Sequence, residues 1–174
     1  SCGIVPGSLL TLKDKMDLKD DDIVRGLIVA SGLGVTFAHA DVSFSGGTGG
    51  CQGEVGISSA LAAAGLVEMV GGSPSQVVHA ASIAIKNILG LICDPIGPIE
   101  VPCIKRNAIG VANAFASAEM ALAGIESAVP ADEVILALKN VQTLLPPELR
   151  SLEIGGLACT PTAAKYRCSI GLGK

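Results

Sequence analysis

Apolar side chains recur at the three- and four-residue spacing of an α-helix through most of this chain, and no stretch shows the alternation of a half-buried strand. One Tyr, three Phe and no Trp among the 174 residues leave the core to Ala, Val, Ile and Leu, which let helices pack closely. We therefore expect an all-α fold, a compact bundle of about five helices joined by Gly- and Pro-rich loops, and a single domain over residues 1–174.

Helix start and stop signals locate these helices. The acidic residues of the charged stretch Lys13–Asp22 suit the positive end of the helix dipole that follows. Gly71 and Gly72 end a second helix, and Ser73 with Pro74 is a strong signal for the start of a third. The predicted helices span residues 23–38, 54–70, 74–88, 105–125 and 131–144, and the Gly-rich tail 151–174 is assigned no element.

Charge and composition argue against several classes of protein. Charged residues such as Arg25 and Glu68 interrupt each apolar stretch before it reaches the roughly 18 residues that a bilayer requires, and residues 1–10 lack the basic region of a signal peptide. A net charge of −4 and no basic run longer than Lys105-Arg106 predict no binding to nucleic acid. Six cysteines are too few for a disulfide-stapled secreted module, so we expect a cytoplasmic protein with reduced thiols.

Three of the cysteines lie in short Gly- or Pro-rich loops beside predicted helix ends. Cys51 follows a run of small residues within Asp41–Gly53, which reads as a tightly turned loop before the second helix. Cys93 and Cys103 stand at the two ends of a segment with three prolines, which cannot be helical. Because helix N-termini stabilise anions, Cys51 and Cys103 suit thiolates that bind a negatively charged iron–sulfur cluster.

Spacing alone leaves other interpretations open. Buried cysteines also serve as small apolar side chains, and this is an equally good interpretation of the three positions. The sequence has no Cys-x-x-Cys pair, which excludes the usual zinc-ribbon and ferredoxin patterns. A non-enzymatic helical protein that binds an iron–sulfur cluster or zinc is a further alternative, although electron carriers normally use four protein thiolates.

The segments around these cysteines carry a family resemblance. They read Gly50-Cys51-Gln52-Gly53-Glu54-Val55-Gly56, Leu89-Gly90-Leu91-Ile92-Cys93-Asp94-Pro95 and Val101-Pro102-Cys103-Ile104-Lys105-Arg106-Asn107-Ala108. Together with Cys2-Gly3-Ile4-Val5-Pro6, Ala62-Ala63-Ala64-Gly65-Leu66 and Gly71-Gly72-Ser73-Pro74, they closely resemble the signature segments of the iron–sulfur-dependent L-serine dehydratases. The resemblance runs from residue 1 to about residue 125, with a weaker match at 155–158.

The resemblance implies a lyase with a [4Fe–4S] cluster bound by Cys51, Cys93 and Cys103. One iron would stay open and act as a Lewis acid for the hydroxyl group of L-serine, which is converted to pyruvate and ammonia in amino-acid degradation and gluconeogenesis. The resemblance also implies that the chain is the C-terminal part of an alpha chain or alpha domain. An upstream segment and a beta subunit or beta domain would complete a homo- or hetero-oligomer.

Four further residues match family positions near the substrate: Ser43, Ser45, Arg106 and Asn107. The two serine hydroxyls suit the substrate carboxylate, but ordinary turn hydrogen bonds explain them equally well. A guanidinium forms a fork that fits a carboxylate, or it is simply solvated beside a helix start.

The general base stays unassigned. We interpret Glu54 as a helix cap rather than a base, since it lies in the first turn of a predicted helix. Asp94 is expected to fix its loop by accepting backbone N–H bonds. His39 and His79 lie outside the segments that match the family, so we interpret both as structural residues.

Two features depart from a simple match to the family. The loop between Cys93 and Cys103 is one residue shorter than expected, which leaves open a related lyase that acts on another small amino acid, such as cysteine. In the tail, Cys168 could occupy the open iron in the resting state. Cys2 and Cys159 have no assigned role.

Overall fold

The computed structural model describes residues 3–96, 102–150 and 154–171, with the backbone alone at residues 102 and 103. Within these ranges it contains eight α-helices and no β-strand, so the all-α prediction is confirmed and the count of about five was too low. The helices are α1 Ile4–Met16, α2 Asp20–His39, α3 Gly46–Gly49, α4 Ile57–Met69, α5 Pro74–Asn87, α6 Pro102–Leu122, α7 Ala131–Leu144 and α8 Pro161–Ser169. A π-helix, Gln52–Gly56, runs into α4, and short 3₁₀ turns occupy Pro147–Leu149 and Gly156–Cys159.

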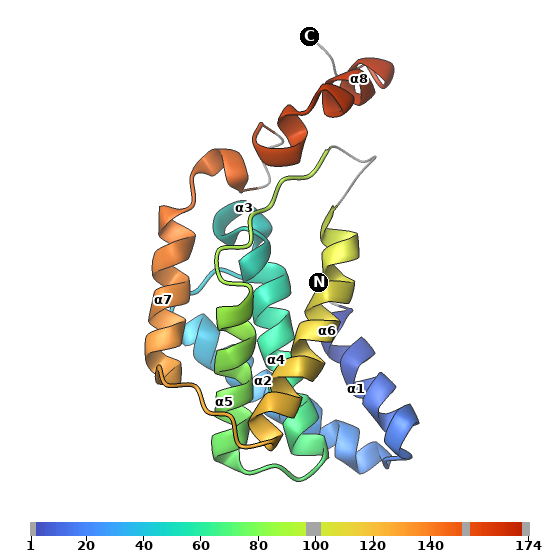
Figure 1. Cartoon of the computed structure of the whole chain (residues 1–174), viewed down its shortest axis with the longest axis vertical. Helices are drawn as coiled ribbons and strands as arrows, with labels where there is room; N and C mark the ends of the chain where they lie inside the picture. The colour runs from blue at the N-terminus through green and yellow to red at the C-terminus, as the bar shows by residue number, and fades with distance from the viewer. Residues whose placement is uncertain (1–2, 97–101, 151–153, 172–174) are drawn as a thin grey trace.

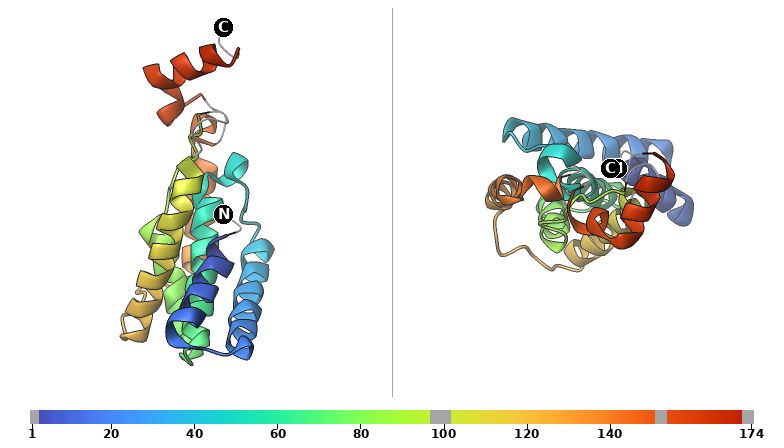
Figure 2. Two further views of the ribbon diagram at one scale, coloured as in Figure 1. Left: turned by 90° about the vertical axis from the view of Figure 1, so that its right-hand side faces the viewer. Right: turned by 90° about the horizontal axis from the view of Figure 1, so that it is seen from above.

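Helix α4 forms the centre of the bundle, and α1, α2, α5 and α6 pack around it (Figures 1 and 2). Ten of its thirteen residues are buried, so no side of α4 faces solvent. A Cβ atom added to Gly65 would lie 2.9 Å from the carbonyl oxygen of Gly26 in α2. The backbones of α2 and α4 are therefore in direct contact, as the small side chains of the core predicted.

Three helices lie where the sequence was assigned none: the one-turn α3, which falls in the predicted loop before Cys51, and the longer α1 and α8. Helix α1 begins at Ile4 after Gly3, whose position offers no side-chain cap, so a start signal is missing there. Helix α8 lies in the tail and has such a signal: the hydroxyl of Thr160 accepts from the N–H of Ala163, and Pro161 is the first helical residue. The Gly-rich surroundings hid this signal.

Other helix bounds shift by a few residues. Helix α2 begins at Asp20 rather than residue 23, because the carboxylate of Asp22 accepts the N–H of Lys19 at 2.8 Å and stabilises an earlier start. Helix α6 runs from 102 to 122 instead of 105 to 125, and Gly124 follows with a φ of +87°. The bounds of α7 agree with the prediction.

By length and composition, α2 alone among the helices of the described ranges could cross a membrane. A core helix of a soluble protein or a signal sequence passes the same test, so this finding is weak evidence. Helix α2 packs against α4 on one side and exposes Val24, Ile28 and Val35 on the other. The absence of a membrane association stays a prediction.

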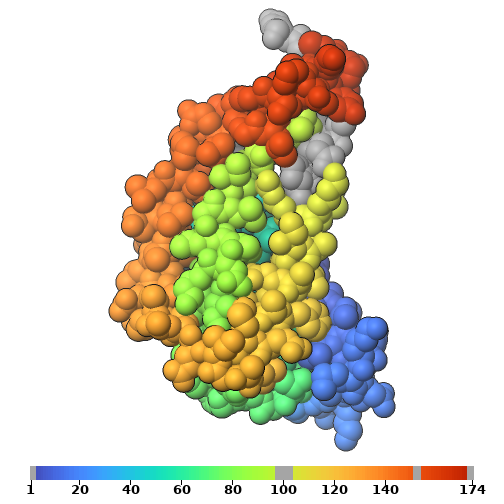
Figure 3. Space-filling view, viewed as in Figure 1, coloured from blue at the N-terminus to red at the C-terminus, as the bar shows by residue number. Residues whose placement is uncertain are grey.

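The segments that carry the candidate residues meet at one end of the bundle. Figure 1 shows α3, the chain that leaves α5 and the beginning of α6 at this end, beside the end of α7. The space-filling view shows the C-terminal segment with α8 extending beyond the same end (Figure 3). The fold thus brings together residues from about 43 to 157.

Candidate functional site

The segment before Cys51 is more regular than the predicted loop. It forms α3 and then turns at Gly50, whose φ of +70° and whose tight approach to the carbonyl oxygen of Leu91 leave no room for a side chain. Cys51 follows, fully buried, and the π-helix Gln52–Gly56 leads into α4. The predicted helix start at Glu54 was therefore wrong, and a π-helical turn, frequent at functional sites, stands directly after the cysteine.

Gln52 ties the Cys51 segment to the Cys93 segment. Its N–H donates to the carbonyl oxygen of Leu91 at 2.9 Å, and its side-chain Oε1 accepts the N–H of Gly90 at 2.6 Å. Gln52 is itself 1% exposed, so water does not compete for these bonds. The π-helix and the chain leaving α5 are held together two residues away from Cys93.

Cys93 is buried and is fixed from the opposite side by the chain that follows α7. Its N–H donates to the carbonyl oxygen of Leu149 at 2.8 Å, and an isolated parallel bridge pairs it with Arg150. The Arg150 guanidinium donates to the carbonyl oxygens of Thr143 and Leu145 at the end of α7. Helix α7 is thereby linked to the position of Cys93.

Asp94 is buried beside Cys93. Its Oδ2 accepts a backbone N–H, as predicted, but the donor is Leu157 at 3.1 Å, 63 positions along the chain, rather than a residue of its own loop. A Cβ atom on Gly156, which has a φ of +57°, would lie 2.7 Å from Asp94. The segment 155–158, a weak match on sequence, therefore packs directly on the Cys93 segment.

The side chain of Arg106 joins three parts of the site. Its Nη1 donates to the carbonyl oxygen of Ile92 at 2.9 Å and lies 3.5 Å from the sulfur of Cys51, and its Nη2 forms an ion pair with Oδ1 of Asp94 at 2.8 Å. Burial acts to lower the pKa of Arg106, but the hydrogen bonds to Cys51 and Asp94 outweigh it and raise the pKa above its usual value. Arg106 is an organised cation of the site, not a solvated one, and its neighbour Asn107 is half-buried.

Cys103 is the second residue of α6, three positions before Arg106. Positions three apart lie on the same side of a helix, so Cys103 stands one turn from the contact between Arg106 and Cys51. Its side chain and residues 97–101 lie outside the described residues. Among the side chains that are described, no group of three or more His, Cys, Asp or Glu is arranged to bind a metal ion.

The two predicted substrate serines take part in turn hydrogen bonds. Ser43 Oγ accepts the N–H of Ser45 at 3.2 Å, and Ser45 Oγ accepts the N–H of Gly47 at 3.2 Å at the start of α3. Each hydroxyl still has its hydrogen to donate. The segment therefore presents two oriented hydroxyl groups close to the Cys51 turn.

Glu54 is a cap, as predicted, but of a different helix. Its Oε1 accepts the N–H of Gly46 at 3.0 Å, the first residue of α3, rather than capping the helix that contains it. A Cβ atom on Gly46 would lie 3.2 Å from that oxygen and 3.3 Å from the sulfur of Cys93. Glycine at position 46 keeps the space beside Cys93 open.

Comparison with known proteins identifies the family of the chain. The sequence model of the family described as "Serine dehydratase alpha chain" matches residues 1–158. The chain belongs to this family. It is 49% identical over 171 residues to the "Probable L-serine dehydratase, alpha chain" of Bacillus subtilis (strain 168), covering 98% of this chain and 57% of that protein.

Other members of the serine dehydratase alpha chain family are similarly close. The protein of the same description from Latilactobacillus sakei is 47% identical over 171 residues, covering 98% of this chain and 81% of that protein. The "L-serine dehydratase, alpha chain" of Peptoniphilus asaccharolyticus is 47% identical over 168 residues, covering 96% and 57%. The chain thus spans 57% of the length of two of these three relatives.

Within this serine dehydratase alpha chain fold, the two histidines lie apart from the cysteine segments. Nδ1 of His79 accepts the N–H of Ser127 at 3.1 Å, a structural role as predicted. His39 is exposed at the last turn of α2. In the tail, Cys168 is exposed on α8, the thiol of Cys159 donates to the carbonyl oxygen of Ile154, and Cys2 lies outside the described residues.

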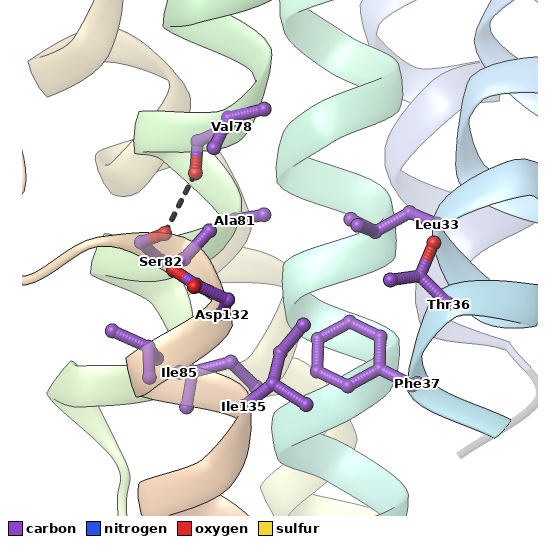
Figure 4. A pocket seen from close by; sticks show the side chains of 11 residues that line it. Leu33, Thr36, Phe37, Val78, Ala81, Ser82, Ile85, Asp132 and Ile135 are labelled. Atoms are coloured by element: carbon purple, nitrogen blue, oxygen red, sulfur yellow. Dashed lines mark hydrogen bonds between the residues drawn. The ribbon is translucent and has the colours of Figure 1, made fainter. Parts of the chain in front are cut away.

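An apolar pocket of about 260 Å³ lies between α2, α5 and α7 (Figure 4). Leu33, Phe37, Ile85 and Ile135 project into it, and the hydroxyl of Ser82 is bonded to the carbonyl oxygen of its own helix at 2.8 Å. None of the candidate cysteines, serines or arginine lines this pocket. Its polar lining is limited to Thr36, Ser82 and Asp132, and the other side chains that line it are apolar.

Sequence reasoning missed Gln142. It lies four residues after the core residue Leu138 on the buried side of α7 and is 5% exposed. A polar residue at a helix position where the pattern calls for an apolar one was the available signal. Its carboxamide is hydrogen-bonded to the backbone of Ser43.

Proposed function

We propose that this chain is the cluster-binding part of a lyase that converts L-serine to pyruvate and ammonia, with a [4Fe–4S] cluster held by Cys51, Cys93 and Cys103. The observation that carries the proposal is the position of Arg106. One helical turn after Cys103, it contacts the sulfur of Cys51 and the carbonyl oxygen that precedes Cys93. The names of the relatives support serine as the substrate.

The chemistry of the site suits such a cluster. Thiolates are the ligands that bind iron–sulfur clusters, and a ligated thiolate cluster is negatively charged. Arg106 places a cation beside Cys51, and the N-terminal turn of α6 adds a positive dipole end at Cys103. Gly46 leaves open the space that a Cβ atom would fill next to Cys93.

When bound, the cluster supplies a Lewis acid for the hydroxyl leaving group of serine. The residues of this chain bind and orient the substrate. Ser43 and Ser45 donate their hydroxyl hydrogens to its carboxylate, and Arg106 and Asn107 complete the carboxylate site from α6. Loss of the Cα proton and of water gives aminoacrylate, which tautomerises to an imine and is hydrolysed by water to pyruvate and ammonia. The base that removes the Cα proton is left unassigned.

The proposal extends to the assembly. A relative described as an alpha chain implies a separate beta chain, so we propose that this chain acts with a beta subunit or beta domain in an oligomer in the cytoplasm. Because the chain spans 57% of two of its relatives, the test uses the full-length chain with that partner.

The experiment compares Cys93→Ser with Cys159→Ser after anaerobic reconstitution with iron and sulfide. Cys93 is buried in the site, whereas Cys159 is exposed on a 3₁₀ turn, so the two variants remove the same thiol in different places. We expect Cys93→Ser to lose most bound iron and all serine-dependent pyruvate formation, and Cys159→Ser to match the parent. Full activity in Cys93→Ser would refute the proposed function.

A further inference from the structure

The carboxamide of Gln142 pairs with both backbone groups of Ser43. Its Oε1 accepts the N–H of Ser43 at 2.9 Å, and its Nε2 donates to the carbonyl oxygen of Ser43 at 2.7 Å. This is the pairing that one strand offers another, made here by a single side chain across 99 positions of sequence. The two bonds fix both the location and the rotation of the Ser43 peptide groups.

The Gly-rich segment is shaped around this carboxamide. A Cβ atom on Gly49 would lie 2.5 Å from Nε2 of Gln142, and one on Gly53 would lie 3.1 Å from the same atom. Both glycines are buried. The chain from Ser43 to Gly53 therefore closes over the Gln142 side chain, and larger residues at 49 and 53 would displace it.

Helix α7 and the 3₁₀ turn that follows it contact the two cysteine segments. Gln142 binds the segment before Cys51, and Leu149, which follows α7, binds the N–H of Cys93. Elsewhere α7 packs mainly on α5. A helix at the edge of the bundle thus sets the relative position of Ser43 and Cys93.

We propose that Gln142 is a positioning residue that places the hydroxyl of Ser43 for the substrate carboxylate. The inference rests on the proposed function, in which Ser43 binds that carboxylate. The Gln142 bonds fix the backbone that carries the Ser43 side chain, and the N–H of Ser45, which donates to Ser43 Oγ at 3.2 Å, limits the directions in which the hydroxyl can donate. Loss of both Gln142 bonds lets this backbone move and carries the hydroxyl away from the carboxylate. A hydrogen bond to a charged group contributes about 1.5–3 kcal/mol, so the Michaelis constant for L-serine rises about tenfold or more when it is lost.

The test uses the full-length chain with its partner, reconstituted anaerobically. Gln142→Met keeps the length and most of the volume of the side chain and removes both hydrogen bonds. Asn140→Met is the matched control, since Asn140 is exposed on the same helix. Measurements are kcat and KM for L-serine, bound iron, the thermal midpoint, and a serine titration followed by the electron paramagnetic resonance of the reduced cluster.

We expect Gln142→Met to raise KM and the serine concentration at half-titration about tenfold, with bound iron unchanged and kcat within about threefold of the parent. Asn140→Met keeps both constants. An active parent whose Gln142→Met variant retains the parent KM overturns this inference alone. So does a variant that loses iron and thermal stability without a change in KM. A parent that forms no pyruvate overturns the proposed function, and this inference with it.

A second variant carries the test if Gln142→Met does not fold. In Gln142→Glu, the protonated carboxyl donates to the carbonyl oxygen of Ser43, whereas the carboxylate repels it. The same polar pocket is lined by three charged residues, Asp41, Lys139 and Arg150, whose charges influence the ionisation of the introduced carboxyl group. The KM of the variant is therefore divided by the KM of the parent at each pH. We expect relative KM to rise with pH. A pH-independent ratio near one contradicts the inference.

Discussion

The guanidinium of Arg106 lies 3.5 Å from the sulfur of Cys51. The same group forms an ion pair with Asp94, the residue after Cys93, and the side chains of this pair are only 17% and 4% exposed. A single cation thus connects two of the proposed cluster ligands from a helix that carries the third. The contact thus links the Cys51 and Cys93 segments to α6, whose second residue is Cys103.

Two replacements of Arg106 separate the effect of its positive charge from the effect of its planar guanidinium group. Arg106→Lys keeps a cation near Cys51, and Arg106→Gln removes it, so reduction of a bound cluster becomes less favourable in the Gln variant alone. We expect the midpoint potential of the reconstituted cluster to become more negative in Arg106→Gln and to stay near the parent value in Arg106→Lys. Equal potentials in all three proteins would argue against an electrostatic role.

Asp94→Asn removes one partner of a buried ion pair while it keeps an acceptor for the N–H of Leu157. The Arg106 guanidinium then stays buried without its counter-charge, and such losses cost about 3 kcal/mol. Chemical unfolding of the metal-free chain measures this as a lower transition midpoint. A change of less than about 1 kcal/mol would show that solvent already compensates Arg106.

Two adjacent glycines make a matched pair. A methyl group at Gly46 would press on Glu54 and on the sulfur of Cys93, whereas one at Gly47 meets only the Ser45 hydroxyl at an ordinary 3.6 Å. Overpacking of this kind costs about 1–3 kcal/mol. We expect Gly46→Ala to bind less iron on reconstitution and Gly47→Ala to bind as much as the parent. Equal iron content in both variants would mean that the cluster does not need the space that Gly46 leaves open beside Cys93.

The start of α2 predicts a pH-dependent effect away from the site. The backbone N–H of Lys19 is the main cause of the lowered pKa of Asp22, with Arg25 adding to it against an opposing effect of burial. A lowered folded pKa contributes stability above the ordinary Asp pKa of about 3.9, and this contribution disappears as pH falls through the folded pKa. The thermal midpoint of Asp22→Ala should therefore lie below that of the parent at pH 7 and converge with it in acid.

Asp21→Ala is the control for this prediction. This variant removes one negative charge from the same helical turn. Asp21 is exposed, and the N–H of Lys19 donates to Asp22 instead, so the variant keeps that bond. We expect a smaller loss than in Asp22→Ala. An equal loss in both variants would assign the effect to the helix dipole alone.

Helices with strong start or stop signals, and residues that lie in a characteristic local sequence, could be predicted from the sequence. The α7 bounds and the Ser73-Pro74 start of α5 were predictable, because each depends on residues close together in the chain. That Asp94 accepts a backbone N–H was predicted as well, but its donor Leu157 lies 63 positions away and was not. Helix α1 was not predictable, because its start has no cap and tertiary packing stabilises it.

Long-range partners were beyond the sequence. The Gln142 bonds to Ser43 and the capping of α3 by Glu54 depend on how distant segments pack, which no local spacing encodes. Arg106 was recognised as a site residue, yet its partners Asp94 and Cys51 became visible only in the fold. No local pattern marked the π-helix after Cys51 either, and its first residue, Gln52, is bonded to Gly90, 38 positions away.

The most direct test is the Mössbauer spectrum of the full-length enzyme with its partner, reconstituted with ⁵⁷Fe and compared before and after addition of L-serine. A cluster held by three thiolates has one distinct iron site, and the account predicts that serine shifts the signal of that site alone while pyruvate is formed. Equivalent iron sites whose signals serine leaves unchanged, or a protein that binds zinc in their place, would contradict it.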